Sequence, residues 1–287
     1  RKARDAGFAR AIQDIIAAAL LLALPAGLQA QQAPGAAAPG QAPAGQAAKT
    51  FSQQELDQIL APIALYPDPL IAQILMASTY PLEVVQAARW AKDNPKVTGK
   101  ALEDAMAKQP WDPSVKALTT VPQVLNQMND KLDWTQKLGD AFLAQQKDVL
   151  ATVQSLRAKA DAAGNLKSTE QQVVKKEQQG SQTVYIIESP KPETVYVPTY
   201  NPATVYGTWW YSYPPPYYYY PPGYVYGGAG LAFATGVVVG AAIWGNCNWG
   251  GNEININRTN YNNFNKTNIQ NNNFQHNAAN RKGVPYK

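Results

Sequence analysis

Apolar residues follow a helical period through residues 60–90, and prolines stand where that period is interrupted. A proline disfavours helical geometry in the residue before it, so one helix is expected to end before Pro67 and another before Pro81. Pro62 lacks a backbone donor and is expected to kink or split the first helix. The pattern predicts three successive helices, the last ending near Asp93.

The start of this stretch carries a capping pattern. Ser52 followed by Glu55 has the form of a capping box, in which each side chain accepts a hydrogen bond from the other's backbone N–H. We interpret Asp68, which stands before Pro69, as the N-cap of the second helix. A contact with a ligand or a partner is the alternative interpretation of Asp68.

The helical pattern continues well beyond this stretch. Further helices are expected after Thr98 and Asp112, each an N-cap residue type. One long helix is expected from Asp133 to Gly164, because its apolar positions advance in steps of three, four and one seven. Residues 50–165 are therefore predicted to form an all-helical domain, long enough to bury a core.

The periodicity changes after a polar stretch. Residues 166–182 are mixed in charge, and we interpret them as a polar spacer. The tripeptide Thr-Val-Tyr then occurs three times, beginning at Thr183, Thr194 and Thr204. Strand-forming residues between proline turns predict a small antiparallel β meander over residues 183–207, docked on the helices.

The remaining chain is low in complexity, and residues 194–252 contain no charged side chain. Residues 208–226 are a Tyr/Pro-rich tract, residues 227–245 an apolar glycine-rich segment, and residues 246–287 an asparagine-rich tail. The expected fold class is mainly α. A helical bundle domain is followed by a small β meander and a low-complexity Tyr/Pro-, Gly- and Asn-rich C-terminal region.

Three motifs resemble those of one bacterial envelope family, known as domain of unknown function 3300. They are ALYPDPLIAQILMASTYPLEVVQAARW at 64–90, VYVPTYNPATVYG at 195–207 and HNAANRKGVPY at 276–286. The resemblance implies a secreted or envelope-bound protein of a Gram-negative bacterium, and it supplies no catalytic residues. The last motif departs from the family pattern, because Ala278 and Asn280 replace a proline and a second histidine. This departure weakens any metal or acid–base role there.

The N-terminal residues are typical of a protein that is exported. Residues 1–30 read as a signal peptide, with a basic start, an apolar run at 15–24 that is too short to span a membrane, and cleavage expected after Ala30. Residues 31–49 contain mostly Ala, Pro, Gly and Gln and are expected to be a disordered linker. The predicted location is periplasmic or outer-membrane associated.

Charge and reactive residues exclude several classes of function. The formal net charge is +5, but the basic side chains are not clustered as nucleic-acid binding requires. The single cysteine, Cys247, and the single histidine, His276, stand apart from any nucleophile–base pattern. We expect no metal site, no small-molecule cofactor, no nucleic-acid partner and no catalytic residue.

Carboxylates of the helical domain are the one enzymatic alternative. A cell-wall polymer could be cleaved by a pair chosen from Asp68, Glu83, Asp104 and Asp112, although no spacing selects a pair. We interpret Glu83 and Asp104 as solvated charges on helix surfaces.

The aromatic and glycine-rich segments offer the strongest candidates for binding. The aromatic tract could stack on peptidoglycan sugars or on prolines of a partner, or serve only as a spacer. A Gly-xxx-Gly pattern is typical of helices that insert in membranes or self-associate, and a glycine-rich soluble segment is the alternative. The candidate interaction residues are Trp209, Trp210, Tyr211, Gly236, Gly240 and Trp244.

The sequence thus predicts an exported envelope protein that is not an enzyme and that has a structural or scaffolding role. Its expected partners are a membrane, peptidoglycan or further copies of itself. An enzyme acting on wall polymer and an aromatic carbohydrate-binding module are the two alternatives.

Overall fold

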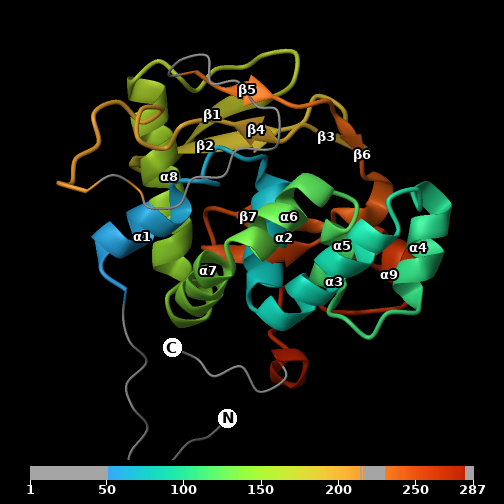
Figure 1. Ribbon diagram of the computed structural model, residues 1–287. Helices are drawn as coiled ribbons and strands as arrows, with labels where there is room; N and C mark the ends of the chain where they lie inside the picture. Colours follow the sequence, from blue (N-terminus) through green and yellow to red (C-terminus); the bar gives the residue numbers. More distant parts are fainter. Residues whose placement is uncertain (1–50, 214, 216–229, 282–287) are drawn as a thin grey trace, which may run out of the picture. The chain divides into compact units, whose positions relative to one another are not determined.

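The computed structural model shows nine α-helices and eight short strands in the part of the chain that it describes (Figure 1). All the described residues belong to one compact unit, Gln46–Lys287. The mainly α class is confirmed. The structure describes residues 51–213, 215 and 230–281. The predicted signal peptide (1–30), the linker (31–49), positions 214 and 216–226 of the Tyr/Pro-rich tract, positions 227–229 of the glycine-rich segment and positions 282–287 of the asparagine-rich tail lie outside the described residues. The helices are α1 (Gln53–Leu60), α2 (Asp68–Ser78), α3 (Pro81–Asp93), α4 (Gly99–Ala107), α5 (Pro113–Leu118), α6 (Pro122–Asp130), α7 (Leu132–Ala144), α8 (Gln146–Ala162) and α9 (Arg258–Asn265).

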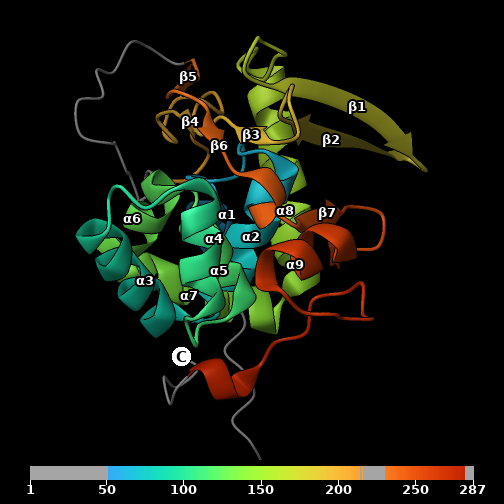
Figure 2. The same cartoon turned by 90° about the vertical axis from the view of Figure 1, so that its right-hand side faces the viewer.

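Helix α2 lies at the centre of the hydrophobic core. Pro69 is its only residue that is not buried, and α3, α5, α7 and strand β7 (Gly245–Asn248) all contact it (Figures 1 and 2). A helix buried on all sides requires apolar residues around its whole circumference, which the sequence LIAQILMA provides. The stretch that carries the helical period therefore forms the middle of the fold.

Helix α1 begins as predicted. The backbone N–H of Glu55 donates to Ser52 Oγ at 3.3 Å, and the N–H of Ser52 donates to Glu55 Oε2 at 2.8 Å, so the capping box is confirmed.

The end of α1 is closed by tyrosines from the second family-like motif. The hydroxyls of Tyr200 and Tyr206 donate to the Ala61 carbonyl at 2.9 and 2.5 Å. The N–H of Leu65, which would continue the helix ladder to Ala61, donates instead to the Tyr200 hydroxyl at 3.3 Å. The predicted effect of Pro62 is confirmed, since α1 ends before it, and these hydroxyls satisfy the backbone groups left there.

The long helix predicted from Asp133 to Gly164 is wrong. Helices α7 and α8 meet at Gln145, whose φ of −143° is not helical. The Gln145 side chain accepts from the N–H of Phe51 at 2.5 Å and donates to its carbonyl at 3.3 Å, so it ties the break to the start of α1. The apolar step of seven spans this break. Gly164 does follow the end of α8, with a φ of +75°.

The first strands form a hairpin that begins earlier than predicted. Strand β1 (Val173–Gln179) pairs with β2 (Gln182–Glu188) in antiparallel register, and β2 contacts α8. The polar spacer interpretation of residues 166–182 is therefore wrong, because β1 lies within it. Its sequence VVKKEQQ is mostly exposed and so lacks the alternation that signals a half-buried strand.

The other strands do not form the predicted meander. Strand β3 (Thr194–Val195) pairs with β6 (Val237–Val238), and β4 (Pro198–Thr199) pairs with β5 (Ala232–Phe233). The third Thr-Val-Tyr copy lies in hydrogen-bonded turns. The glycine-rich segment thus pairs with residues 194–199, at the start of the second family-like motif.

Glycines of that segment serve backbone packing. A Cβ at Gly236 would lie 2.7 Å from the Tyr196 ring, and Gly240 has a φ of +52° at the start of a short 3-10 turn, Gly240–Ala242. The helical interpretation of the Gly-xxx-Gly pattern is wrong in residues 230–245, which hold short strands and this turn. Within the described chain, no helix combines the length and the hydropathy that a membrane span needs.

The asparagine-rich region packs on α2. Strands β7 and β8 (Glu253–Ile256) form an antiparallel hairpin, followed by α9 and by a 3-10 turn, Ala278–Arg281 (Figure 2). Gly245 lies so close to α2 that an added Cβ would be 2.6 Å from Met76 Cε and 3.1 Å from Ala72 Cβ. These described parts of the C-terminal region therefore complete the core.

Candidate functional site

Asp68 joins three distant parts of the fold. Asp68 is 2% exposed, and its carboxylate accepts from Arg157 Nη1 at 2.6 Å and from Trp249 Nε1 at 2.7 Å. The N–H of Ile187 also donates to it, at 3.2 Å. The N-cap interpretation of Asp68 is wrong, because Pro67 occupies that position and no side chain caps α2. Burial raises the pKa of the Asp68 carboxyl, and Arg157 opposes that shift.

Arg157 is the centre of this cluster. Its guanidinium also donates to the carbonyls of Ala64, Tyr66 and Tyr185 at 2.8, 2.9 and 2.7 Å, and it lies 4.9 Å from the centroid of the Trp249 ring. The buried charge is therefore surrounded by acceptors and an aromatic face. These hydrogen bonds hold residues 64–68, at the start of the first family-like motif, in place.

The third family-like motif docks on the junction of α2 and α3. Arg281 Nη2 pairs with Asp140 Oδ1 at 2.5 Å, and its Nη1 donates to the Thr79 carbonyl at 3.3 Å. The His276 ring stacks on Tyr80 with centroids 5.0 Å apart. Burial and the nearby Arg281 lower the pKa of His276.

The carboxylates considered for catalysis fall in three places. Glu83 is buried, so its interpretation as a solvated charge is wrong; its Oε2 accepts from the N–H of Asp112 at 2.5 Å. Asp112 caps α5 through the N–H of Ser114 at 2.9 Å, and burial raises the pKa of Asp112. Asp104 is exposed and pairs with Lys100, as expected of a surface charge. Only Glu83 and Asp112 come together, while Asp68 pairs with Arg157.

Trp209, Trp210 and Tyr211 form an aromatic cluster beside α1 and α8. The ring centroids of Trp209 and Trp210 are 4.2 Å apart. Trp210 Nε1 and the Tyr211 hydroxyl donate to Asp57 at 2.9 and 3.0 Å, so a buried carboxylate holds both side chains in place. Lys159 Nζ lies 4.1 Å from the centroid of the Trp210 ring.

A hollow of about 410 Å³ opens beside this cluster. Trp210 and Tyr211 form its aromatic wall, and side chains of α1 and α8, all polar except Ala151, form the rest. We call it the aromatic groove; it is lined by Gln53, Asp57, Asp148, Ala151, Thr152, Ser155, Lys159, Trp210 and Tyr211.

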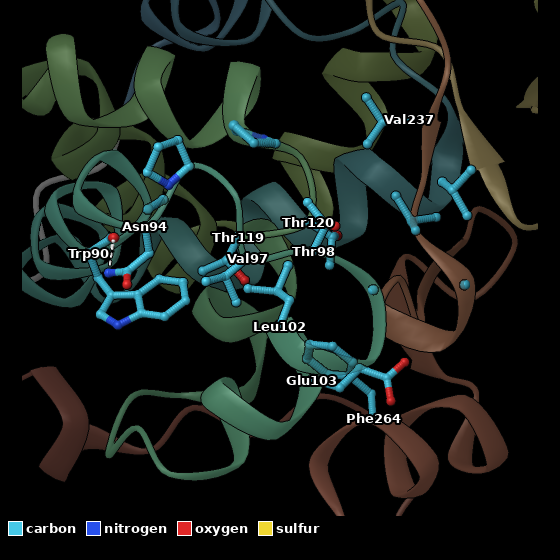
Figure 3. Close-up of a pocket in the computed structure, with 17 residues that line it drawn as sticks. Trp90, Asn94, Val97, Thr98, Leu102, Glu103, Thr119, Thr120, Val237 and Phe264 are labelled. Carbon is cyan, nitrogen blue, oxygen red and sulfur yellow. Dashed lines mark hydrogen bonds between the residues drawn. The ribbon is translucent and has the colours of Figure 1, made fainter.

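A second hollow, of about 300 Å³, is mainly apolar (Figure 3). Trp90 and Asn94 lie on one side, Val237 lies on the other, and Leu102 lies between them. Gly240 is part of this lining, and the neighbouring Val238 is 74% exposed.

A third hollow, of about 580 Å³, adjoins the start of α2. Asparagines from β7, β8 and the start of α9 line it, together with the first residues of α2 and the last residues of β2. We call it the asparagine cavity; it is lined by Pro67, Asp68, Pro69, Ile186, Glu188, Ser189, Pro192, Val195, Ile243, Trp244, Gly245, Asn246, Asn255, Ile256, Asn257 and Asn260.

The six residues predicted to interact thus do not form one surface. The structure brings together Trp209, Trp210 and Tyr211, places Gly240 in the apolar hollow and Trp244 in the asparagine cavity, and uses Gly236 for strand packing. Within residues 51–213, 215 and 230–281, no three His, Cys, Asp or Glu side chains are grouped as metal ligands would be.

Sequence reasoning missed Arg157. It stands four residues after Val153 and one after Leu156, on the buried face of α8. A lone arginine among apolar positions of a helix is a signal for a buried charge that needs a partner, and the aspartate of the Pro-Asp-Pro turn is that partner.

Comparisons with known proteins agree with these motifs. The chain is 43% identical over 196 residues to "Uncharacterized protein YacH" of Escherichia coli (strain K12), a match that covers 58% of this chain and 32% of that protein. The chain thus spans about a third of the length of this relative. No solved structure matches. The family model described as "Protein of unknown function (DUF3300)" matches residues 52–282, and the chain therefore belongs to that family.

Proposed function

We propose that this chain is an exported, non-catalytic scaffold protein of the cell envelope and that it attaches to wall polymer through the aromatic groove. The observation that carries the proposal is the wall of Trp210 and Tyr211, which Asp57 fixes beside polar side chains of two helices.

The groove has the composition that a glycan with peptide stems requires. The Tyr211 ring provides an apolar face for a sugar ring, and amide and hydroxyl groups provide hydrogen bonds. Besides the buried Asp57, Lys159 and Asp148 add one charge of each sign, which suits a polymer carrying both amines and carboxylates. Because Asp57 holds the rings in place, little side-chain entropy is lost on binding.

The buried charges support a scaffold. Asp68 and Arg281 each join segments that are far apart in the sequence, and each lies in a family-like motif. A carboxylate surrounded by donors from three segments joins those segments. The predicted signal peptide at 1–30 supports export of the protein.

The test is co-sedimentation of the full chain with purified peptidoglycan sacculi. Tyr211→Ala should lower the bound fraction several-fold, whereas Tyr211→Phe should lower it less, because it keeps the ring and loses only the hydrogen bond to Asp57. Tyr213→Ala is the matched control, since Tyr213 is exposed and does not line the groove. No sedimentation of the wild type, or equal binding by Tyr211→Ala, would refute attachment through the groove.

The same incubation tests whether the protein is an enzyme. The supernatant should contain no new soluble muropeptides by chromatography. Their release by the wild type would favour the enzymatic alternative, with Glu83 and Asp112 as the first residues to substitute.

A further inference from the structure

The asparagine cavity combines neutral polar groups with apolar walls. Four asparagine side chains and the Ser189 hydroxyl provide both donors and acceptors. Prolines, isoleucines, Val195 and Trp244 provide the apolar surface. A volume of about 580 Å³ lies in the range of small-molecule sites, roughly 300–1,000 Å³.

The β7–β8 hairpin and the start of α9 position the asparagines. Asn246 and Asn255 are cross-strand partners, so their side chains lie on the same face of the hairpin. Asn257 caps α9 by accepting from the N–H of Asn260 at 3.1 Å, which places both at the first turn of that helix. Amides from three short elements therefore surround one space.

The charges of the lining select the ligand. Asp68 and Glu188 are its only ionisable side chains, and Asp68 is already paired with Arg157. Glu188 is paired with Lys175 at 2.7 Å, so neither carboxylate is free to bind a cation, and the lining has no Lys, Arg or His to bind an anion. The lining therefore disfavours phosphates and free carboxylates.

Trp244 contributes part of its ring to the wall of the cavity and is 2% exposed. Its indole Nε1 is buried, so the N–H does not face the cavity. The polar groups that face a ligand are therefore those of the asparagines and Ser189.

We propose that the asparagine cavity binds an uncharged N-acetylated hexosamine unit. The sugar hydroxyls and the acetamide pair with asparagine amides and with the Ser189 hydroxyl, and the acetamide methyl packs on Ile243 and Ile256. This site is separate from the aromatic groove, and it depends on the proposed function only for wall polymer as the source of the sugar.

The test is calorimetric titration of the full chain with N,N′,N″-triacetylchitotriose, with tryptophan fluorescence as a second readout. We expect saturable binding that is about tenfold weaker in Asn246→Ala and in Asn260→Ala, because each loses amide hydrogen bonds. Asn263→Ala on the same helix is the matched control, since Asn263 is exposed and does not line the cavity. Unchanged thermal midpoints would show that the variants fold.

The choice of sugars separates the outcomes. Maltotriose, which lacks the acetamide, and fully deacetylated chitotriose, which carries amines, should each bind about tenfold more weakly. No binding of the triacetylated trimer, equal binding of either other trimer, or unchanged binding in both cavity variants would overturn the proposal. Tyr211→Ala should leave this binding unchanged, so loss of sacculus binding in that variant does not bear on the cavity.

Discussion

At the residue scale, the polar groups of the family-like motifs act mainly on other parts of the same chain. Asp68 pairs with an arginine on α8. The Tyr200 hydroxyl bonds to the backbone N–H of Leu65 and to the carbonyl of Ala61, just after α1. A buried charge that loses its partner keeps its desolvation cost, so these residues should be sensitive to substitution.

Arg157→Met should lower the free energy of unfolding by about 3–5 kcal/mol, because it leaves Asp68 buried without its cation. Urea denaturation measures this loss. Arg89→Met is the matched control, since Arg89 is exposed on α3. Adding Asp68→Asn to Arg157→Met should restore part of the stability, because the unpaired charge is then removed. Equal losses in the two arginine variants would contradict a structural role for the pair.

Asp112 should make stability depend on pH in the acidic range. Burial raises the pKa of its carboxyl above 3.8, so the native protein binds this proton more tightly than the unfolded chain does. The contribution of Asp112 to the free energy of unfolding therefore falls as the pH rises from 3.8 through the raised pKa. Asp112→Asn removes this loss, so the variant should gain stability relative to the wild type as the pH rises. Urea midpoints measured across that range test it, and a constant difference between the two proteins would contradict it.

At the element scale, close backbone contacts decide which residues can stand at helix crossings. A Cβ at Gly139 of α7 would overlap the carbonyl of Ser78 at the end of α2. Helix propensity alone favours alanine over glycine by about 1 kcal/mol, so local and tertiary preferences conflict here.

Gly139→Ala should destabilise the protein by about 1–3 kcal/mol, because the overlap is with backbone that cannot rotate away. Thermal or urea unfolding measures the change. Lys137→Ala is the control on the exposed face of the same helix. A stabilised Gly139→Ala variant would show that α7 and α2 do not pack this closely.

At the scale of the whole molecule, the helical region and the C-terminal region share one core. The β7–β8 hairpin covers α2, and Arg281 reaches Asp140 on α7. The helices up to residue 165 therefore do not bury their apolar surface alone.

A chain cut after Gly207 should lose cooperative unfolding. Removing β7 exposes the α2 surface around Ala72 and Met76, against which Gly245 packs. We expect retained far-ultraviolet circular dichroism of the helices, a weakened near-ultraviolet signal and binding of the dye ANS, as in partly packed states. A sharp, two-state transition in the truncated chain would show that residues 51–207 fold independently.

The helices of the first half could be predicted from the sequence because their determinants are local. Proline positions, the Ser52–Glu55 capping box and the glycine after α8 act within one or two turns of the backbone. Motifs were sufficient to identify the family. Trp209, Trp210 and Tyr211 lie together because they are adjacent in the sequence, and their role as an interaction surface stays a prediction.

The break at Gln145, strand β1, the burial of Glu83 and the partner of Asp68 could not be predicted in this way. Each depends on a contact with a segment far along the chain, such as Phe51 for Gln145 or Arg157 for Asp68. Local periodicity determined where helices form, since a helix satisfies its own backbone hydrogen bonds. Tertiary packing alone decided which charges are buried and which asparagines share a cavity, because those energies arise only when remote segments exclude water together.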